Sequence, residues 1–396
     1  ASGYWINLEK RLKAPLRERS IERTTLTGKQ TLILTGGNRF IGANLARLLM
    51  KSGRYRVVNL DALTYAANPL SLADLDTNAD YVFVKGNITD RELVASLFKQ
   101  YQPVGILHLA AESHVDRSIV HAEDFLQTNV IGTFILLEAA RAYWNGLTGE
   151  EKESFRFLHV STDEVFGSLG ADGYFTEETP YAPNSPYSAS KASSDHFVRA
   201  FHHTYGLPTV ITNCSNNYGP YQFPEKMIPL MILNAISGKP LPVYGDGSNV
   251  RDWLYVEDHC KAIQLVFEKG VPGEVYVVGG SNEQKNLNLV NQICSILDEV
   301  APPEEVNQLR EQGLKSYKEL IRFVTDRPGH DRRYAIDSGK IQRQLGWQAE
   351  VRFEAGLRQT IEWYLQNTER VDQVSGGAYG EWIKKNYAWR AEKESK

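Results

Sequence analysis

Apolar runs alternate with amphipathic stretches along the chain from Gln30 onward. Short apolar runs typical of buried strands cover residues 31–37, 55–61, 79–86, 106–111 and 155–162. Apolar residues recur at helical spacing over residues 40–53, 91–101, 125–144 and 194–206. Continuous apolar strands separated by helices indicate a parallel sheet that is covered on both faces. The pattern therefore predicts an α/β fold with a doubly wound, Rossmann-like parallel sheet.

The pattern loosens after Gly219. Residues 223–238 and 286–302 are predicted helices, 241–256 is extended and rich in turns, and the polar stretch 302–317 is predicted to be a surface excursion. We expect this half to form a smaller mixed α/β lobe that binds the substrate. The predicted boundaries are an N-terminal extension (1–29), a cofactor-binding domain (30–215, to which the chain returns at about 251–270) and the second lobe with C-terminal helices (216–396).

The basic N-terminal extension contains no apolar centre of the kind found in signal peptides. It is compatible with a tag remnant, a presequence remnant or a peripheral helical arm.

Composition excludes several classes of function. The net charge is −4, from 44 Lys and Arg against 48 Asp and Glu, so no global field favours nucleic acid or a membrane surface. An anionic substrate therefore needs a local basic cluster. No apolar run reaches membrane-spanning length. Cys214, Cys260 and Cys294 lack metal-ligand spacing, which predicts no metal site and reduced core thiols in a cytoplasmic protein.

The stretch TGGNRFIG, Thr35 to Gly42, joins the first predicted strand to the first predicted helix. Glycines at this position let the backbone turn sharply and offer N–H groups to a pyrophosphate at the helix N-terminus. Asp61 ends the second strand about twenty residues later, as expected for a carboxylate that binds a ribose. A carboxylate there repels a 2′-phosphate, so the predicted cofactor is NAD.

Two further motifs carry candidate chemistry. In YSASK, Tyr187 and Lys191 are four residues apart and share one helix face. An ammonium near a phenol favours the phenolate, which is a base for a hydroxyl proton. In STDEVFG, the adjacent carboxylates Asp163 and Glu164 follow a buried strand. They suit either a helix N-terminus or an active site at the carboxyl end of the sheet.

From about Gln30 to Gln366 the chain resembles the extended short-chain dehydrogenases/reductases, and most closely their dTDP-glucose 4,6-dehydratase family. The matching stretches are LDALTYAAN, AAESHVDRSI, STDEVFG, PYSASKASSDH, NCSNNYGPYQFPEK, VRDWLYVEDH and DRPGHDRRYAID. Epimerases of the same fold share the Tyr/Lys pair but usually lack the Thr-Asp-Glu run.

The resemblance implies a lyase that converts dTDP-glucose to dTDP-4-keto-6-deoxyglucose and water in deoxysugar biosynthesis. Tyr187, beside Lys191, removes the 4-hydroxyl proton while NAD takes hydride from C4. Glu164 then removes the C5 proton, Asp163 protonates the departing 6-hydroxyl, and hydride returns to C6. Thr162 hydrogen-bonds the 4-hydroxyl. The two carboxyl groups need different proton affinities, which unequal burial supplies.

The resemblance also implies the binding residues and the assembly. NAD is expected at Gly36, Gly37, Arg39, Phe40, Ile41, Gly42, Asp61, Leu63, Thr64, Asn87, Ile88, Leu109, Ala110, Ala111, Ser113, Thr128, Tyr187, Lys191 and Asn217. The nucleotide-sugar is expected at Ser113, Thr162, Asn216, Lys226, Tyr244, Arg251, Asn286, Arg327 and His330. A homodimer is expected through the helices at 124–144 and 185–205. The alternatives are another nucleotide-hexose 4,6-dehydratase or 4-epimerase, and a non-catalytic nucleotide-sugar-binding homologue.

The chain departs from the family pattern near the cofactor. Asn38 and Arg39 replace a small residue and a glycine, Asn87 replaces an acidic residue, and Phe166 replaces a tyrosine. Glycine at such a turn often has positive φ, which is unfavourable for arginine. We therefore expect Arg39 to weaken NAD binding, unless its guanidinium contacts the pyrophosphate.

Overall fold

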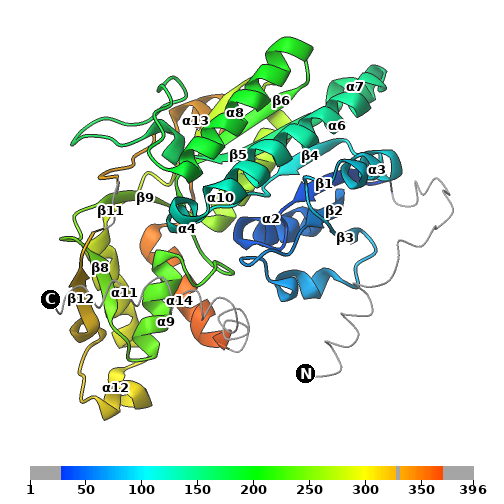
Figure 1. Cartoon of the computed structure of the whole chain (residues 1–396). Helices are drawn as coiled ribbons and strands as arrows, with labels where there is room; N and C mark the ends of the chain where they lie inside the picture. Colours follow the sequence, from blue (N-terminus) through cyan, green and yellow to red (C-terminus); the bar gives the residue numbers. More distant parts are fainter. Residues whose placement is uncertain (1–27, 327–330, 369–396) are drawn as a thin grey trace.

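The computed structural model describes residues 28–326 and 331–368, and a parallel seven-stranded sheet lies at its centre (Figure 1). Its order is β10-β6-β5-β4-β1-β2-β3, and every neighbouring pair is parallel. The strands are β1 (Gln30–Thr35), β2 (Tyr55–Asp61), β3 (Tyr81–Lys85), β4 (Gly105–His108), β5 (Arg156–Thr162), β6 (Thr209–Cys214) and β10 (Val275–Val278). The predicted doubly wound sheet is confirmed.

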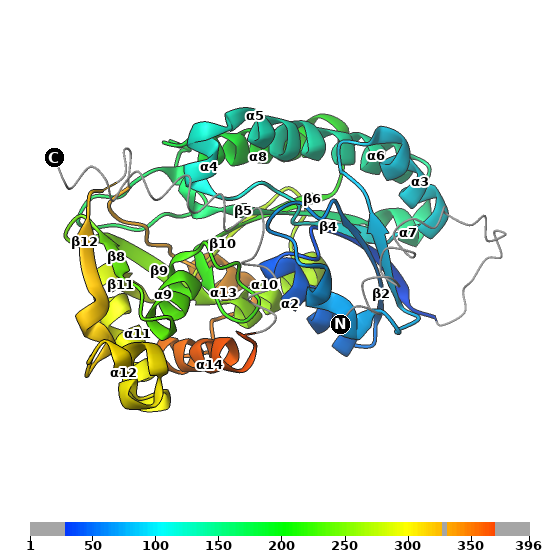
Figure 2. The ribbon, with the colours of Figure 1, turned by 60° about the horizontal axis from the view of Figure 1, so that its bottom comes forward.

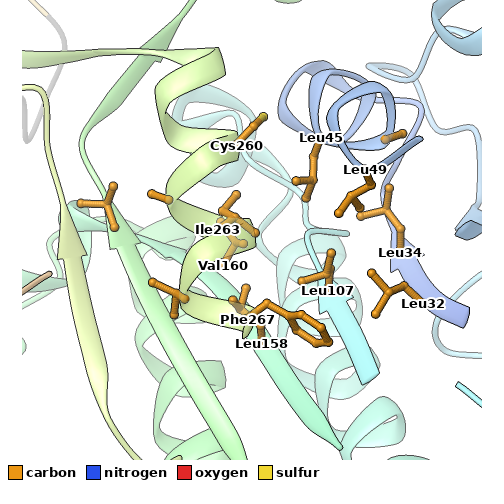
Figure 3. Packing of buried hydrophobic residues seen from close by; sticks show 14 of the residues in the cluster. Leu32, Leu34, Leu45, Leu49, Leu107, Leu158, Val160, Cys260, Ile263 and Phe267 are labelled. Atoms are coloured by element: carbon orange, nitrogen blue, oxygen red, sulfur yellow. The ribbon is translucent and has the colours of Figure 1, made fainter. Parts of the chain in front are cut away.

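Helices cover both faces of this sheet (Figure 2). The larger ones are α2 (Phe40–Lys51), α3 (Arg91–Tyr101), α6 (Thr133–Asn145), α8 (Pro186–Tyr205), α10 (Val256–Lys269) and α13 (Gly339–Leu345). In β1, Leu32 and Leu34 pack toward α2 and α10, whereas Ile33 packs into the other layer with α3, α6 and α8. Figure 3 shows the first of these layers, where Leu45 and Ile263 meet the sheet. Strand alternation thus divides the core into two layers.

A smaller lobe contains a three-stranded and a two-stranded sheet. Its strands are β7 (Asn216–Tyr218), β8 (Leu241–Tyr244), β9 (Val250–Tyr255), β11 (Glu283–Lys285) and β12 (Ile321–Val324), and its longer helices are α9 (Met227–Ile236), α11 (Asn286–Val300) and α14 (Phe353–Gln366). The predicted smaller mixed α/β lobe is therefore present.

The polar stretch 302–317 is more than the predicted surface excursion. It contains η4 (Pro303–Glu305) and α12 (Asn307–Glu311), and η5 (Tyr317–Leu320) begins at its end. Leu309 and Tyr317 are fully buried in the core of the smaller lobe. Most of the stretch is exposed, as predicted, but its short helices and buried anchors were missed because a few apolar residues among many polar ones form no recognisable periodic pattern.

The predicted helix over 125–144 is divided by a turn of π-helix. The other short elements are η1 (Pro69–Leu75), α4 (Val115–Val120), α5 (Ala122–Phe125), η2 (Leu126–Gly132, the π-helix), α7 (Gly149–Ser154) and η3 (Asp163–Phe166). Gly132 is the last residue of the π-helical segment, and a Cβ there would lie 2.5 Å from Ile88 Cδ1, so the position favours glycine. π-Turns in helices are frequent at functional sites, and this one lies beside the loop that follows β4.

The three cysteines are buried and free, as their spacing predicted. Within the residues that the structure describes, no helix combines the length and apolar character needed to cross a membrane.

Candidate active site

The carboxyl ends of the parallel strands meet at one edge of the large sheet, and most of the predicted site residues follow these ends. This edge is where α/β proteins of this architecture bind their ligands.

The glycine-rich turn after β1 has the geometry that a dinucleotide requires. Gly36 has φ +76°, and a Cβ there would lie 2.8 Å from the backbone of Ala110 in the loop after β4. The Gly37 N–H donates to Asn59 Oδ1 at 3.0 Å. Helix α2 begins at Phe40, and its N-cap residue makes no side-chain capping hydrogen bond to any described residue. The first N–H groups of α2, including Ile41 and Gly42, therefore remain suited to a pyrophosphate.

Asp61 lies buried at the end of β2, beside the glycine turn. Its carboxylate accepts hydrogen bonds from the backbone N–H groups of Asn38 at 2.9 Å and Leu63 at 2.8 Å. Burial raises its pKa, while these two donors and Arg39 lower it. The carboxylate is thus fixed in orientation, with acceptor capacity left for ribose hydroxyls.

Arg39 does not have the strained backbone that the sequence suggested. Its φ is −97°, so the expectation of left-handed strain is wrong; the residue with positive φ in this turn is Gly36. The Arg39 guanidinium instead donates to the carbonyl of Ala111 and lies 3.7 Å from the Glu112 carboxylate. Its side chain is only 15% exposed. Arg39 therefore bridges from the glycine turn to the loop after β4.

The other residues predicted to bind NAD line the same edge. Leu109 and Ala110 donate to Thr35 Oγ1 at 3.2 and 3.1 Å. Thr64 Oγ1 is 3.5 Å from Glu112, and Thr128 lies in η2. Asn87 Oδ1 accepts from Thr89 N at 3.0 Å, and Ile88 is buried. Asn217 Oδ1 lies 2.8 Å from His259 Nδ1. The glycine turn, the helix N-terminus and Asp61 together fit NAD.

The acidic pair begins the 3₁₀ turn η3, directly after β5. Thr162 Oγ1 donates to Asp163 Oδ1 at 3.3 Å and accepts from the Glu164 N–H at 3.3 Å. Asp163 is buried and Glu164 half-buried. Burial, with smaller contributions from Glu164 and Asp252, raises the pKa of Asp163 well above its ordinary value. The adjacent carboxyl groups thus have the unequal environments expected for an acid and a base.

Asp163 also keeps one oxygen available. Its Oδ2 has no hydrogen-bond partner within the described part of the chain. A buried carboxyl oxygen without a partner is costly, which is typical of a group that receives a ligand.

Tyr187 and Lys191 lie one turn apart on α8, whose start is fixed by a capping box between Ser185 and Ser188. Both side chains are buried. Burial raises the pKa of Tyr187 well above its ordinary value, and Glu164 adds to this, whereas Thr162 lowers it. The Lys191 ammonium donates to the Val160 carbonyl at 2.9 Å. Lys191 is not among the groups that contribute most to the pKa of Tyr187, so the expected lowering of the phenol pKa by Lys191 is not seen and burial dominates.

Asn129 is a site residue that the sequence analysis missed. Its side chain accepts from Glu112 N at 2.8 Å and donates to Glu112 O at 2.9 Å and to Ser190 Oγ at 2.8 Å. Ser190 Oγ in turn donates to the Tyr187 carbonyl at 2.7 Å. Asn129 thus joins the loop after β4 to the helix that carries Tyr187. The available signal was an asparagine inside a predicted helix.

The residues predicted to bind the nucleotide-sugar come from both lobes. Arg251 on β9 is buried, donates to the Asp331 carbonyl at 2.8 Å, and lowers the pKa of Asp163. Lys226, at the start of α9, donates to the Ser113 carbonyl at 3.0 Å.

The remaining predicted contacts are more dispersed. Tyr244 lies beside the turn that ends at Gly247, and the Gly247 carbonyl accepts from Leu287, the residue after Asn286. Asn216 lies on β7. Arg327 and His330 lie outside the described residues.

Phe166, one of the departures from the family pattern, is buried in an aromatic cluster. Its ring centroid lies 5.2 Å from that of Phe175 and 5.3 Å from that of Tyr181. A phenylalanine is therefore well accommodated at this position.

Comparisons with known proteins agree with this geometry. The family described as "GDP-mannose 4,6 dehydratase" matches residues 33–360. The chain is 54% identical to "dTDP-glucose 4,6-dehydratase 1" of Escherichia coli (strain K12) over 368 residues, which are 91% of this chain and 99% of the relative. It is 58% identical to the dTDP-glucose 4,6-dehydratase of Xanthomonas campestris pv. campestris (strain B100) over 349 residues, 88% and 97% of the two chains.

Solved structures show the same relationship. The dTDP-glucose 4,6-dehydratase from Bacillus anthracis str. Ames in complex with NAD has a TM-score of 0.76 and 44% identity, covering 87% of this chain and 99% of that one. The UDP-glucose 4-epimerase from Thermotoga maritima reaches a TM-score of 0.73 at 27% identity, covering 86% and 100%. The epimerase fold is therefore shared, while sequence identity is higher to the dehydratases. The chain belongs to the dTDP-glucose 4,6-dehydratase family.

Proposed function

We propose that the protein is an NAD-dependent dTDP-glucose 4,6-dehydratase, a hydro-lyase that forms dTDP-4-keto-6-deoxyglucose and water. The observation that carries the proposal is the adjacent pair Asp163 and Glu164, unequally buried and next to the Tyr187 phenol. An elimination needs both an acid and a base, and the raised pKa of Asp163 supplies the acid.

NAD is held by the glycine turn and the start of α2, with Asp61 on the adenosine ribose. When bound, NAD would supply the hydride acceptor for oxidation at C4 of the hexose and the hydride donor for reduction at C6. The residues proposed to contact NAD are Gly36, Gly37, Arg39, Phe40, Ile41, Gly42, Asp61, Leu63, Thr64, Asn87, Ile88, Leu109, Ala110, Ala111, Ser113, Thr128, Tyr187, Lys191 and Asn217.

The proton steps belong to the groups on β5, η3 and α8. Tyr187 removes the 4-hydroxyl proton, and Thr162 hydrogen-bonds the same hydroxyl. Burial makes the Tyr187 phenolate a strong base, and its formation depends on positive charge nearby; Lys191 is the cation one turn along the helix. Glu164 then takes the C5 proton that the 4-ketone has acidified. Asp163 protonates the departing 6-hydroxyl through its available Oδ2.

The nucleotide-sugar lies between the two lobes. Arg251 and Lys226 neutralise the diphosphate, Arg251 with a planar fork that suits two phosphate oxygens. The other proposed contacts are Ser113, Thr162, Asn216, Tyr244, Asn286, Arg327 and His330. In domain terms, residues 30–215 with about 251–270 bind NAD, and 216–396 mainly bind the nucleotide-sugar.

The active form is a cytoplasmic homodimer. The proposed interface consists of the helices at 124–144 and 185–205. It is supported by apolar side chains exposed on these segments, Leu126 (51%), Ile131 (38%), Phe197 (41%) and Tyr205 (45%), since patches of this kind mark contacts between proteins.

The test is incubation of the purified protein, supplied with NAD, with dTDP-glucose, UDP-glucose and CDP-glucose. We expect a 4-keto-6-deoxy product and the highest kcat/KM for dTDP-glucose. A preference for another base would assign a different nucleotide-hexose 4,6-dehydratase, and a 4-epimer as product would assign an epimerase. NAD and substrate binding without turnover would assign a non-catalytic homologue.

A further inference from the structure

A buried polar network lies behind Lys191, on the side of α8 that faces β5. His159 Nε2 is 3.2 Å from the Lys191 ammonium and also 3.2 Å from Asp195 Oδ1. Lys191, His159 and Asp195 are each at most 4% exposed. At such burial, water cannot solvate these groups, and a buried ammonium without a compensating charge is strongly unfavourable.

The Asp195 carboxylate is anchored through one oxygen only. Its Oδ2 accepts hydrogen bonds from Ser161 Oγ at 2.8 Å, Tyr181 OH at 2.9 Å and Asn213 Nδ2 at 3.2 Å. Three donors stabilise the ionised carboxylate and fix its rotation. Oδ1, which has no hydrogen-bond partner of good geometry among the described residues, is thereby held facing the imidazole of His159.

Asp195 is the one group facing Lys191, among the described residues, that supplies negative charge. From β5 and β4, His159 and His108 are held neutral because burial lowers both pKa values, that of His159 to about 4. From β6, Cys214 is a neutral thiol whose pKa burial raises to about 12. On α8 and in η3, burial raises the pKa values of Tyr187 and Asp163, which favours their neutral forms.

We propose that Asp195 is a positioning residue for Lys191 and that, acting across His159, it keeps the Lys191 ammonium charged and aimed at the end of β5. The role of Lys191 in the reaction rests on the proposed function; the charge coupling between Asp195 and Lys191 does not. Burial lowers the pKa of Lys191 to about 8, and Asp195 raises it. Removing the Asp195 charge therefore lowers the pKa of Lys191, into the pH range in which the enzyme works.

The first measurement is the Nζ titration of Lys191 by NMR of the NAD-loaded protein labelled with ¹⁵N-lysine, assigned with Lys191→Arg. We expect a transition near pH 8 in the wild type and one at least about one unit lower in Asp195→Asn. Tyr181→Phe is the matched control, since it removes one hydrogen bond from the same carboxylate but keeps its charge, and its transition should remain within about 0.3 units. An unchanged transition in Asp195→Asn would overturn the proposal, whatever reaction the enzyme catalyses.

The second measurement is the pH dependence of kcat with dTDP-glucose. Asp195→Asn should move the alkaline limb to lower pH by about one unit, which is about a fivefold loss at pH 8 and approaches tenfold at higher pH, with KM within about twofold. Activity should recover toward pH 6.5. If Asp195→Asn does not fold, Asp195→Ser removes the same charge with a smaller side chain. A loss that is equal at every pH would contradict the proposal and indicate a purely structural role.

Discussion

Replacing Arg39 by glycine or by alanine separates two explanations for how this residue affects NAD binding. A pyrophosphate at the start of α2 has to lie between the glycine turn and the loop after β4, which Arg39 now bridges through the Ala111 carbonyl and Glu112. The φ of −97° is accessible to any residue. If the bridge weakens NAD binding, Arg39→Ala and Arg39→Gly should therefore bind NAD equally tightly, and both more tightly than the wild type.

The magnitude follows from the contacts that the cofactor displaces. The bond to the Ala111 carbonyl is charge-assisted and mostly buried, and such bonds contribute about 1.5–3 kcal/mol. The Glu112 contact at 3.7 Å adds little beyond this. Part of the loss is recovered if the guanidinium rotates toward the pyrophosphate. We expect the variants to bind NAD about tenfold more tightly, which corresponds to about 1.4 kcal/mol.

The assay is calorimetric titration of cofactor-stripped protein with NAD, together with the NAD content of each protein as purified. The wild type should be purified with less than one NAD per chain and should gain activity when NAD is added. Tighter binding by Arg39→Gly alone would point to backbone strain and refute the bridge. Weaker binding by both variants would show that Arg39 is a pyrophosphate ligand.

Further substitutions test the remaining assignments. Tyr187→Phe should slow the formation of enzyme-bound NADH after substrate addition by at least about 100-fold, because the base for C4 oxidation is lost. Rapid-mixing absorbance measures this rate. Glu164→Gln should still form NADH but should slow exchange of the C5 proton with deuterated solvent, and exchange at the normal rate would contradict its role as base. Asp163→Asn should raise the melting temperature at pH 8 but have little effect at pH 4. Burial raises the pKa of Asp163 in the folded protein above its ordinary 3.8. The folded wild-type protein therefore loses stability as pH rises through that raised value and Asp163 ionises, whereas asparagine does not ionise. Gly36→Ala should lower stability in chemical denaturation by more than the about 1–2 kcal/mol that φ of +76° costs, because its Cβ would also lie 2.8 Å from the Ala110 backbone.

Five of the seven strands of the large sheet were predicted because they form short, mostly apolar runs, whereas β6 and β10 were not among the predicted strands. Residues 91–101 were predicted as a helix, and α3 has these bounds. Predictions failed where local pattern and tertiary contact differ. The run 125–144 is helical in composition, but the contacts of Asn129 with Glu112 and Ser190 accompany a π-turn within it. Nothing in the local sequence encodes that interruption.

The candidate site was predictable to the extent that its residues lie in contiguous motifs. The acidic pair and the Tyr/Lys pair could be identified from spacing, and the structure brings Asp163, Glu164 and Tyr187 into one electrostatic group. His159 and Asp195 could not be identified in this way, because their contact joins β5 to α8 across 36 positions of the sequence. Arg39 shows the opposite failure, since its residue type was noted but its φ was misjudged.

Strand β5 connects these parts of the site physically. The Val160 carbonyl holds Lys191, and the Ser161 hydroxyl anchors Asp195. The next two residues, Thr162 and Asp163, enter the site itself. Because β5 pairs with β4 over 156–159 and with β6 over 157–162, these groups cannot shift independently. A shift of register by one residue would turn the side chains of β5 that contact α8 to the opposite face of the sheet. Placing the threonine and the contacts of Lys191 and Asp195 on one central strand, with the acid directly after it, therefore fixes their relative positions, as reaction geometry demands.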